Sequence, residues 1–446
     1  MLEDALVAAG AMRPSNAGAP HKVAWSRSSR TDAGVHSLAT VAGMRLEMEP
    51  GYAASAGTTD PEGRLLAASI NAHLPPSIRI FSAQRVPGGW DARNMCGQRD
   101  YRYYLPASLL GAEPGTTAGD VALAAFRATL ACYEGTHAFH NYTVRRSYRA
   151  EAKESAANRR AGPGRRRERK VVDDDDEVGG GAGEEVEGEE EEGDGALAAA
   201  ALPAPTSPPV PRGDRTCPLL IAPTWWPLPG PPGDPIGPAH YRRVDTARAS
   251  DPAPLVPGGH PAIELRLEGG SFMLRQLRHM VGGAVGVARG ALPPGYPAAA
   301  LRPGARATLP LAPAETLLLS HATFGLYPAG ATGIAGAPPP WVGDRLRLDG
   351  PAGHAAVAEF RGATLAPALS GLCDPSLPAW EWWGRTLGRY AWDAGEMDRF
   401  LEAAAADKDD ASARAAARAA DLEAAGGGGE VRRQRRGGGG RGGRAG

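Results

Sequence analysis

The segment Arg30-Thr31-Asp32-Ala33-Gly34-Val35-His36 brings a carboxylate, a guanidinium and an imidazole together between two apolar stretches of the 446-residue chain. An aspartate two residues before a glycine is typical of a turn, in which the carboxylate bonds its own backbone. A second interpretation is a catalytic carboxylate on a loop, kept ionised by the adjacent Arg30 and the nearby Arg27. From these residues alone both interpretations stay open.

A second segment, Arg99-Asp100-Tyr101-Arg102-Tyr103-Tyr104, reads as a strand that is rich in tyrosine and arginine. Side chains alternate along a strand, so Tyr101 and Tyr103 share one face and Arg102 and Tyr104 the other. Tyr101 is either an ordinary core aromatic or a platform on which an extruded base stacks, flanked by arginines that bind phosphates.

The third segment, residues 271–282, is mostly apolar and carries Arg275 and Arg278 one helical turn apart. An arginine pair on a helix usually faces solvent. Because this helix is so apolar, we expect one of the two arginines to point into a cleft, where it needs a carboxylate partner.

Histidines and cysteines indicate no metal site. His137 and His140 have the spacing of a ligand pair, but no third ligand is apparent. His36 and Asn141 either line a cleft or serve packing and turns. A disulfide framework is not expected, and a reducing compartment fits best, because the cysteines are dispersed and form no CxxC. They are Cys96, Cys132, Cys217 and Cys373.

The charge of the chain is strongly segregated. Overall, 49 Lys and Arg face 50 Asp and Glu, but residues 173–194 hold 13 of the acidic side chains and no basic one. The rest therefore has 49 basic against 37 acidic residues, or +12, which suits a polyanionic partner. No apolar run approaches the roughly 18 residues that span a bilayer, so we expect no membrane partner.

The periodicity of apolar residues along the chain predicts helices that alternate with strands. This pattern favours an α+β fold with a mostly antiparallel sheet. We expect helices near residues 2–7, 61–70, 120–133 and 271–287, and strands at 37–48, 78–86, 101–105 and 263–267.

Together the three segments resemble the TruA-type family of tRNA pseudouridine synthases, nearer its eukaryotic branch. Further matches are residues 70–75 (INAHLP), 133–141 (YEGTHAFHN) and 309–313 (LPLAP). The similarity covers about 1–148 and 261–327, with a weaker echo in 354–395. It implies a pseudouridine synthase fold, in which two lobes share a mostly antiparallel sheet with flanking helices and a basic central cleft.

The resemblance also implies the reaction, the isomerisation of uridine to pseudouridine in tRNA, mostly in the anticodon arm. Asp32 is carried over as the catalytic residue, and whether it attacks the sugar, attacks the pyrimidine or removes a proton stays open. Arg278 is carried over as its ion-pair partner, Tyr101 as the stacking residue and Arg30 as a residue that displaces or holds the flipped nucleotide. No cofactor or metal is implied, and tRNA is the implied partner, while binding of other structured RNA stays open.

Composition and resemblance together suggest a domain organisation. Glycine (60) and proline (41) make up close to a quarter of the chain, too much for one compact domain, so part of it is expected to be disordered. We expect an N-terminal catalytic lobe over 1–110, a C-terminal catalytic lobe over 111–149 and 260–330, a charged and Pro-rich disordered insertion over 150–259, a helical extension over 350–405, and a disordered Gly/Arg-rich tail over 406–446.

Two departures from the family pattern lead to further hypotheses. Family members begin with an extra strand that this sequence lacks before the helix at Leu2, so we expect the coding sequence to extend upstream of Met1. The acidic block 173–194 is either a solvated spacer or a competitor of RNA for the basic cleft. The cluster 165–170 is either a nuclear address or a polyanion contact, and we expect a nuclear or organellar location.

Two rival functions remain at this point. A non-catalytic RNA-binding protein would keep the cleft without turnover, and a nucleoside-cleaving hydrolase would yield free uracil. Salt-sensitive RNA binding is common to the first rival and the enzyme. Only the enzyme releases the hydrogen on carbon 5 of uridine into a pseudouridine product.

Overall fold

The computed structural model describes residues 1–47, 60, 62–84, 86, 89–111, 115–143, 236–324, 351–388, 390, 395 and 397–402. Helices within these ranges are α1 (Leu2–Ala8), α3 (Arg64–Asn71), α4 (Ala92–Met95), α5 (Thr117–Ala131), α7 (Gln276–Ala288), α8 (Tyr296–Ala299), α9 (Pro351–Phe360), α10 (Ala366–Leu372) and α11 (Pro378–Leu387). Strands are β1 (Ser26–Arg27), β2 (His36–Ser37), β3 (Ala42–Gly43), β4 (Cys96–Pro106), β5 (Gly135–Ala138), β6 (Tyr241–Ala249), β7 (Ala253–Pro254), β8 (Pro261–Gly269) and β9 (Leu317–Phe324). No helix in the described ranges is long and apolar enough to cross a bilayer.

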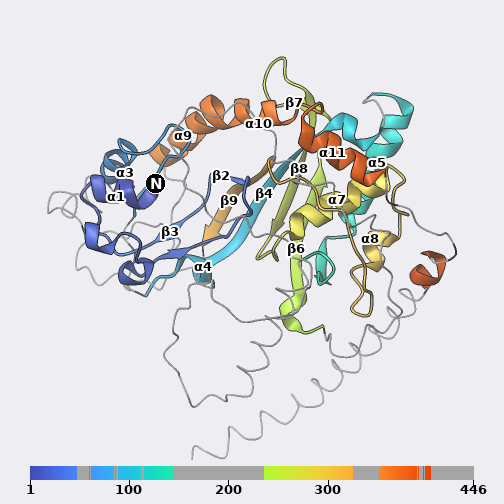
Figure 1. The fold of residues 1–446 in the computed structure, drawn as a ribbon, viewed down its shortest axis with the longest axis horizontal. Coiled ribbons are helices and arrows are strands. Elements are labelled where there is room, and N and C mark those ends of the chain that lie inside the picture. The colour runs from blue at the N-terminus through green and yellow to red at the C-terminus, as the bar shows by residue number, and fades with distance from the viewer. Residues whose placement is uncertain are drawn as a thin grey trace, which may run out of the picture.

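A mixed sheet of seven strands runs through the middle of the described structure (Figure 1). Its order is β2-β9-β4-β8-β6-β5, and β7 pairs with β8. The pair β2 and β9 is parallel, whereas the other described pairs are antiparallel. Together with the helices around it, this sheet confirms the α+β class.

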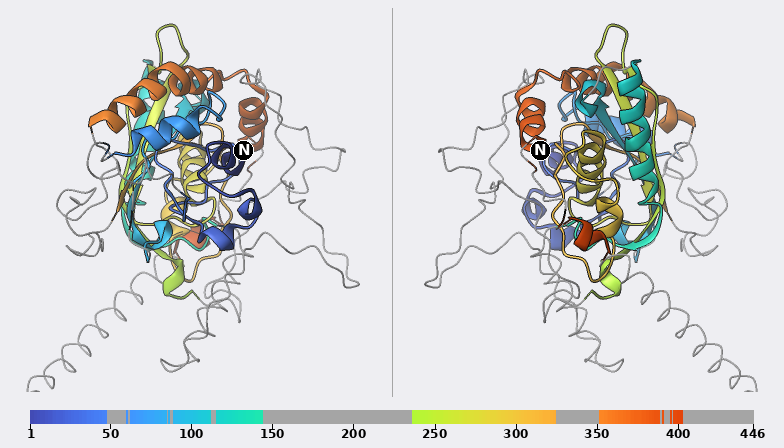
Figure 2. Two further views of the ribbon diagram at one scale, coloured as in Figure 1. Left: turned by 90° about the vertical axis from the view of Figure 1, so that its left-hand side faces the viewer. Right: turned by 90° about the vertical axis from the view of Figure 1, so that its right-hand side faces the viewer.

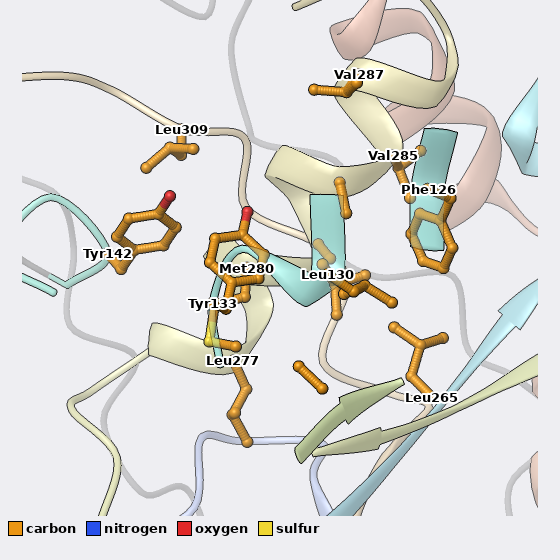
Figure 3. Packing of buried hydrophobic residues seen from close by; sticks show 14 of the residues in the cluster. Phe126, Leu130, Tyr133, Tyr142, Leu265, Leu277, Met280, Val285, Val287 and Leu309 are labelled. Atoms are coloured by element: carbon orange, nitrogen blue, oxygen red, sulfur yellow. The ribbon is translucent and has the colours of Figure 1, made fainter. Parts of the chain in front are cut away.

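Alternation along β4 and β8 builds the main core. Tyr101, Tyr103 and Leu105 of β4 lie opposite Leu267, Leu265 and Ile263 of β8, and all six are buried. Helices α5 and α7 cover this face of the sheet. Figure 3 shows aromatic and aliphatic side chains of α5 and α7, with those of the sheet and the loop of Tyr142, filling the space between them.

Helices α9 and α10 lie over the other face and run along the top of the molecule in both views of Figure 2. A smaller cluster joins Leu365 and Leu369 to Leu38, Tyr104 and Leu318 of the sheet side. At its far end the same segment reaches the N-terminal elements, where the rings of Phe81 and Phe360 meet edge to face, 5.7 Å apart. The C-terminal helices therefore connect the N-terminal elements to the sheet.

Four expectations need correction. The strand predicted over 37–48 is reduced to the two short strands β2 and β3, because each finds only two paired residues. No strand forms in the described part of 78–86. The helix predicted from residue 271 begins at Gln276, since Arg275 has a left-handed φ of 61°. Part of the predicted disordered insertion is ordered, because β6 and β7 lie within 150–259; most of the remainder falls outside the described residues.

Candidate active site

The loop that carries Asp32 is fixed at both ends. Before it, the amide of Ser28 donates to Val41 O at 2.8 Å and the amide of Val41 donates to Ser28 Oγ at 3.0 Å. After it, β2 joins the main sheet beside β9. Between them, the Val35 amide donates to Asp32 O at 3.2 Å, closing a turn in which Gly34 has a φ of 83°. A glycine at the third position suits this turn, because its φ is unfavourable for other residues. The aspartate thus sits at the start of a defined turn.

Arg278 reaches Asp32 across 246 positions of sequence. Its Nη1 donates to Asp32 Oδ2 at 2.7 Å, and each of the two side chains is 15% exposed. The Arg278 Nε donates to Ala312 O at 2.7 Å, which fixes the plane of the guanidinium. Among the described residues no donor bonds Asp32 Oδ1, so Arg278 holds one of the two carboxylate oxygens.

Tyr101 lies at the edge of the same site and is only 6% exposed. Its ring packs edge to face against Phe272, with centroids 5.6 Å apart, and the Ser29 side chain lies beside its hydroxyl. Burial raises the pKa of Tyr101, as does the charge of Asp32, while the nearby Ser29 side chain and the charge of Arg99 oppose the shift. The phenol is therefore neutral at physiological pH. Because the ring is covered, a base can stack on it only if neighbouring groups move.

The other two predicted arginines are on the surface. Arg30 is exposed two residues before Asp32. Arg275 is also exposed, so Arg278 is the arginine of the pair that points inward to a carboxylate, as expected for one of them. Burial lowers the pKa of His36, against the opposing effect of the nearby Glu315 backbone and carboxylate, so this histidine of β2 stays neutral beside the loop.

In the structure Arg99 and Arg102 bond protein groups, whereas one interpretation of the strand had its arginines bind phosphates. Arg99 donates to Ser28 O at 2.6 Å, to Ser29 Oγ at 2.9 Å and to Gly270 O. Arg102 pairs with Glu264 at 2.8 Å and with Asp100 at 3.2 Å on the opposite face of β4. Sequence reasoning missed the internal role of Arg99. The available signal was its position two residues before Tyr101, which places both on one strand face.

His140 and Asn141 serve packing rather than the site. His140 Nε2 lies 2.7 Å from Ala305 O, and Asn141 Nδ2 donates to Ala300 O at 2.8 Å, so both fasten the loop after α8. Burial lowers the pKa of His140 to about 4. His137 Nε2 lies 2.8 Å from the Glu134 carbonyl oxygen. Within the described ranges no three His, Cys, Asp or Glu side chains gather as a metal site would need.

Comparisons with known proteins agree with the motif resemblance over part of the chain. No family model matches it. It is similar to tRNA pseudouridine synthase 1 of Eremothecium gossypii, with 37% identity over 116 residues, or 26% of this chain and 20% of that protein. It is similar to Pseudouridylate synthase 1 homolog of Mus musculus, with 30% identity over 154 residues and 33% of each chain. The homolog of Homo sapiens is 30% identical over 148 residues, covering 32% of this chain and 31% of that protein.

The matched stretch thus spans a third or less of the length of these curated relatives. All three come from eukaryotes and carry names of the pseudouridine synthase type. The resemblance to the eukaryotic branch of the tRNA pseudouridine synthases is confirmed over that stretch.

Proposed function

We propose that this chain is a tRNA pseudouridine synthase, an isomerase that converts uridine to pseudouridine with Asp32 as its catalytic residue. One observation carries the proposal. Asp32 and Arg278 come from segments 246 residues apart, and they meet in a 2.7 Å ion pair at a half-buried position. The names of the relatives supply the reaction type.

The reaction asks little of the protein beyond one placed carboxylate. The bond from carbon 1′ to N1 of uracil breaks, the base turns over, and a bond from carbon 1′ to carbon 5 forms. Carbon 5 loses its proton and N1 gains one, so atoms and electrons balance without an oxidant or reductant. A carboxylate beside the sugar supports attack at carbon 1′, attack on the pyrimidine, or proton removal. Asp32 Oδ1 is the oxygen we assign to this step.

Arg278 prepares the carboxylate in our proposal. Its guanidinium bonds Oδ2 and is itself held by Ala312 O, so the pair is oriented before substrate arrives. Preorganised charges of this kind lose little energy to reorganisation during the reaction. The same contact compensates part of the cost of placing Asp32 where only 15% of its side chain meets solvent.

Tyr101 and Arg30 are assigned to the flipped nucleotide. Flipping a base costs a few kcal/mol. Stacking on an aromatic ring returns about 1–3 kcal/mol, and charged contacts add to it. We propose that exposed Arg30 contacts the RNA as the uridine leaves its helix, and that Tyr101 receives the base after its covering groups move. A basic cleft between two lobes, accommodating the anticodon arm, completes the proposal.

A tritium-release assay tests this function. The full chain is incubated with tRNA that carries tritium on carbon 5 of uridine, and both released tritium and the nucleoside product are measured. Asp32→Asn removes the charge with little change of shape, and we expect turnover to fall by about 10²–10⁴-fold with tRNA affinity within a few-fold. Asp251→Asn is the matched control, because Asp251 is exposed and pairs with Arg127 rather than with Arg278.

The outcomes separate the proposal from its rivals. Binding of tRNA without tritium release by the wild-type chain identifies a non-catalytic RNA-binding protein. Free uracil as the product identifies a hydrolase. Wild-type turnover retained by Asp32→Asn removes Asp32 from the chemical step, even if the chain makes pseudouridine.

A further inference from the structure

We propose that Arg99 is a positioning residue that fixes the Asp32 loop against the segment leading to Arg278, with Ser29 as its link to Tyr101. This inference rests on the proposed function and adds a residue to its machinery. No substrate contact is assigned to Arg99.

Three hydrogen bonds from one guanidinium carry the inference. Nη2 and Nε of Arg99 donate to Ser28 O and Ser29 Oγ, 71 and 70 positions away in sequence, on the loop before Asp32. Nη1 donates to Gly270 O, 171 positions away, at the end of β8. Arg99 itself is on β4, the central strand that also bears Tyr101. A single side chain therefore ties together the three segments that supply Asp32, Tyr101 and Arg278.

Ser29 extends this connection to the tyrosine. Its hydroxyl accepts from Arg99 Nε at 2.9 Å, and its side chain lies beside the Tyr101 hydroxyl. Ser29 thus places the group that Arg99 holds next to the phenol. A shift of the loop away from β4 would break the Arg99 bond and carry Ser29 away from Tyr101.

Arginine is specifically suited to this place. Its guanidinium offers five donors in a flat, rigid fork, whereas lysine offers one rotating ammonium group. The three acceptors come from two separate segments, so a single ammonium group cannot reproduce the arrangement. Arg99 is half-buried, and it donates to two carbonyls and a hydroxyl of the protein rather than to a carboxylate. Its guanidinium therefore bonds groups of the protein itself, as a positioning residue does, whereas a phosphate-binding arginine would direct its donors to the RNA.

Kinetics of Arg99 variants test the inference. A misplacement of about 1 Å at a catalytic group can reduce the rate about 10²-fold. We expect Arg99→Lys to lower kcat by about 10–100-fold while KM for tRNA stays within about threefold. Guanidinium ions added to Arg99→Ala should restore part of kcat. Arg127→Lys is the matched control, because Arg127 also donates to a carbonyl, Ala249 O at 3.1 Å, far from Asp32 along the chain and on other elements.

Hydrogen exchange of the free protein tests, without any substrate, whether Arg99 holds the Asp32 loop. We expect amides of residues 28–35 to lose protection by about tenfold or more in Arg99→Lys and in Ser29→Ala, with little change in α5. Unchanged protection together with kcat within threefold of wild type overturns the inference. If Arg99 variants fail to fold, Ser29→Ala gives the same readouts. If the wild-type chain makes no pseudouridine, the proposed function fails, while the exchange experiment still decides whether Arg99 holds the loop.

Discussion

Substitution of Gly282 in α7 by alanine tests how strongly one added carbon atom disturbs the site. A Cβ at this position would lie 2.0 Å from Pro310 O and 2.7 Å from the carbonyl carbon of Pro310. Side-chain carbons essentially never come closer than 3.0 Å to such atoms, so the helix and the loop must separate by about 1 Å. The glycine is thus required by the close approach of α7 to the loop that contains Pro310 and Ala312.

The displacement reaches the site through Arg278. Ala312 O accepts the Arg278 Nε bond at 2.7 Å, and the Ala312 amide donates to Arg278 O at 3.2 Å. Overpacking a core contact typically costs about 1–3 kcal/mol. We expect Gly282→Ala to lower the free energy of unfolding by about that amount, and a shift of about 1 Å at Arg278 to reduce tritium release by about 10²-fold.

Gly384→Ala is the matched control for this prediction. Gly384 lies inside α11, and a Cβ there would meet nothing within 4 Å. Removing a helix-interior glycine without a clash is expected to stabilise by about 0.5–1 kcal/mol. Urea unfolding of both variants provides the comparison. Equal stability of Gly282→Ala and wild type, with full activity, would refute the reasoning that the close approach of α7 and Pro310 sets the position of Arg278.

Two further predictions concern protonation and charge. Burial lowers the pKa of His140 and of His279 to about 4, against 6.5 for an ordinary histidine, so the unfolded chain binds more protons between these values. The free energy of unfolding should therefore fall as pH drops from about 6.5 to 4, by up to about 1.4 kcal/mol per pH unit for each histidine, and His140→Gln should flatten the denaturation profile. If the acidic block competes with RNA, deletion of residues 173–194, which removes 13 negative charges, should tighten tRNA binding at low salt, and this effect should disappear at high salt. Equal affinity of the deleted and full chains at low salt would leave the block as a spacer.

The site residues were predictable where a chemical type and a backbone pattern coincide. The patterns placed Asp32 at a turn, Tyr101 on an alternating strand and Arg275 and Arg278 on an apolar helix, and the family resemblance then singled out Asp32, Tyr101 and Arg278. The structure brings Asp32 and Arg278 into contact and places Tyr101 beside their loop. Their assigned roles stay predictions, because position alone does not measure turnover.

The strands were less predictable, because alternating apolar residues indicate which face of a strand is buried but not which other strand pairs with it. The pattern over 37–48 is regular, yet β2 pairs with β9 for two residues and β3 pairs with β1 for two. The opposite error affects β6, which we had assigned to the insertion. Its charged and small residues resemble the segment before it, and only Val244 and Ala247 are buried. Backbone pairing with β8 and β5 orders this strand, although few of its side chains are buried.

Backbone carbonyls hold much of the site together, and this explains why its sequence signature is so sparse. Arg278 donates to Ala312 O, Arg99 to Ser28 O and Gly270 O, and the buried Tyr103 hydroxyl to Pro313 O at 3.0 Å. A carbonyl acceptor is supplied by any residue at the position, so the side chain there is free to vary. The donor side chains are not free to vary, because replacing one leaves buried carbonyls without partners, at a cost of about 1–3 kcal/mol each. Sequence identity is therefore expected to concentrate in the donors and in glycines such as Gly282, which allow the carbonyl-bearing loops to approach.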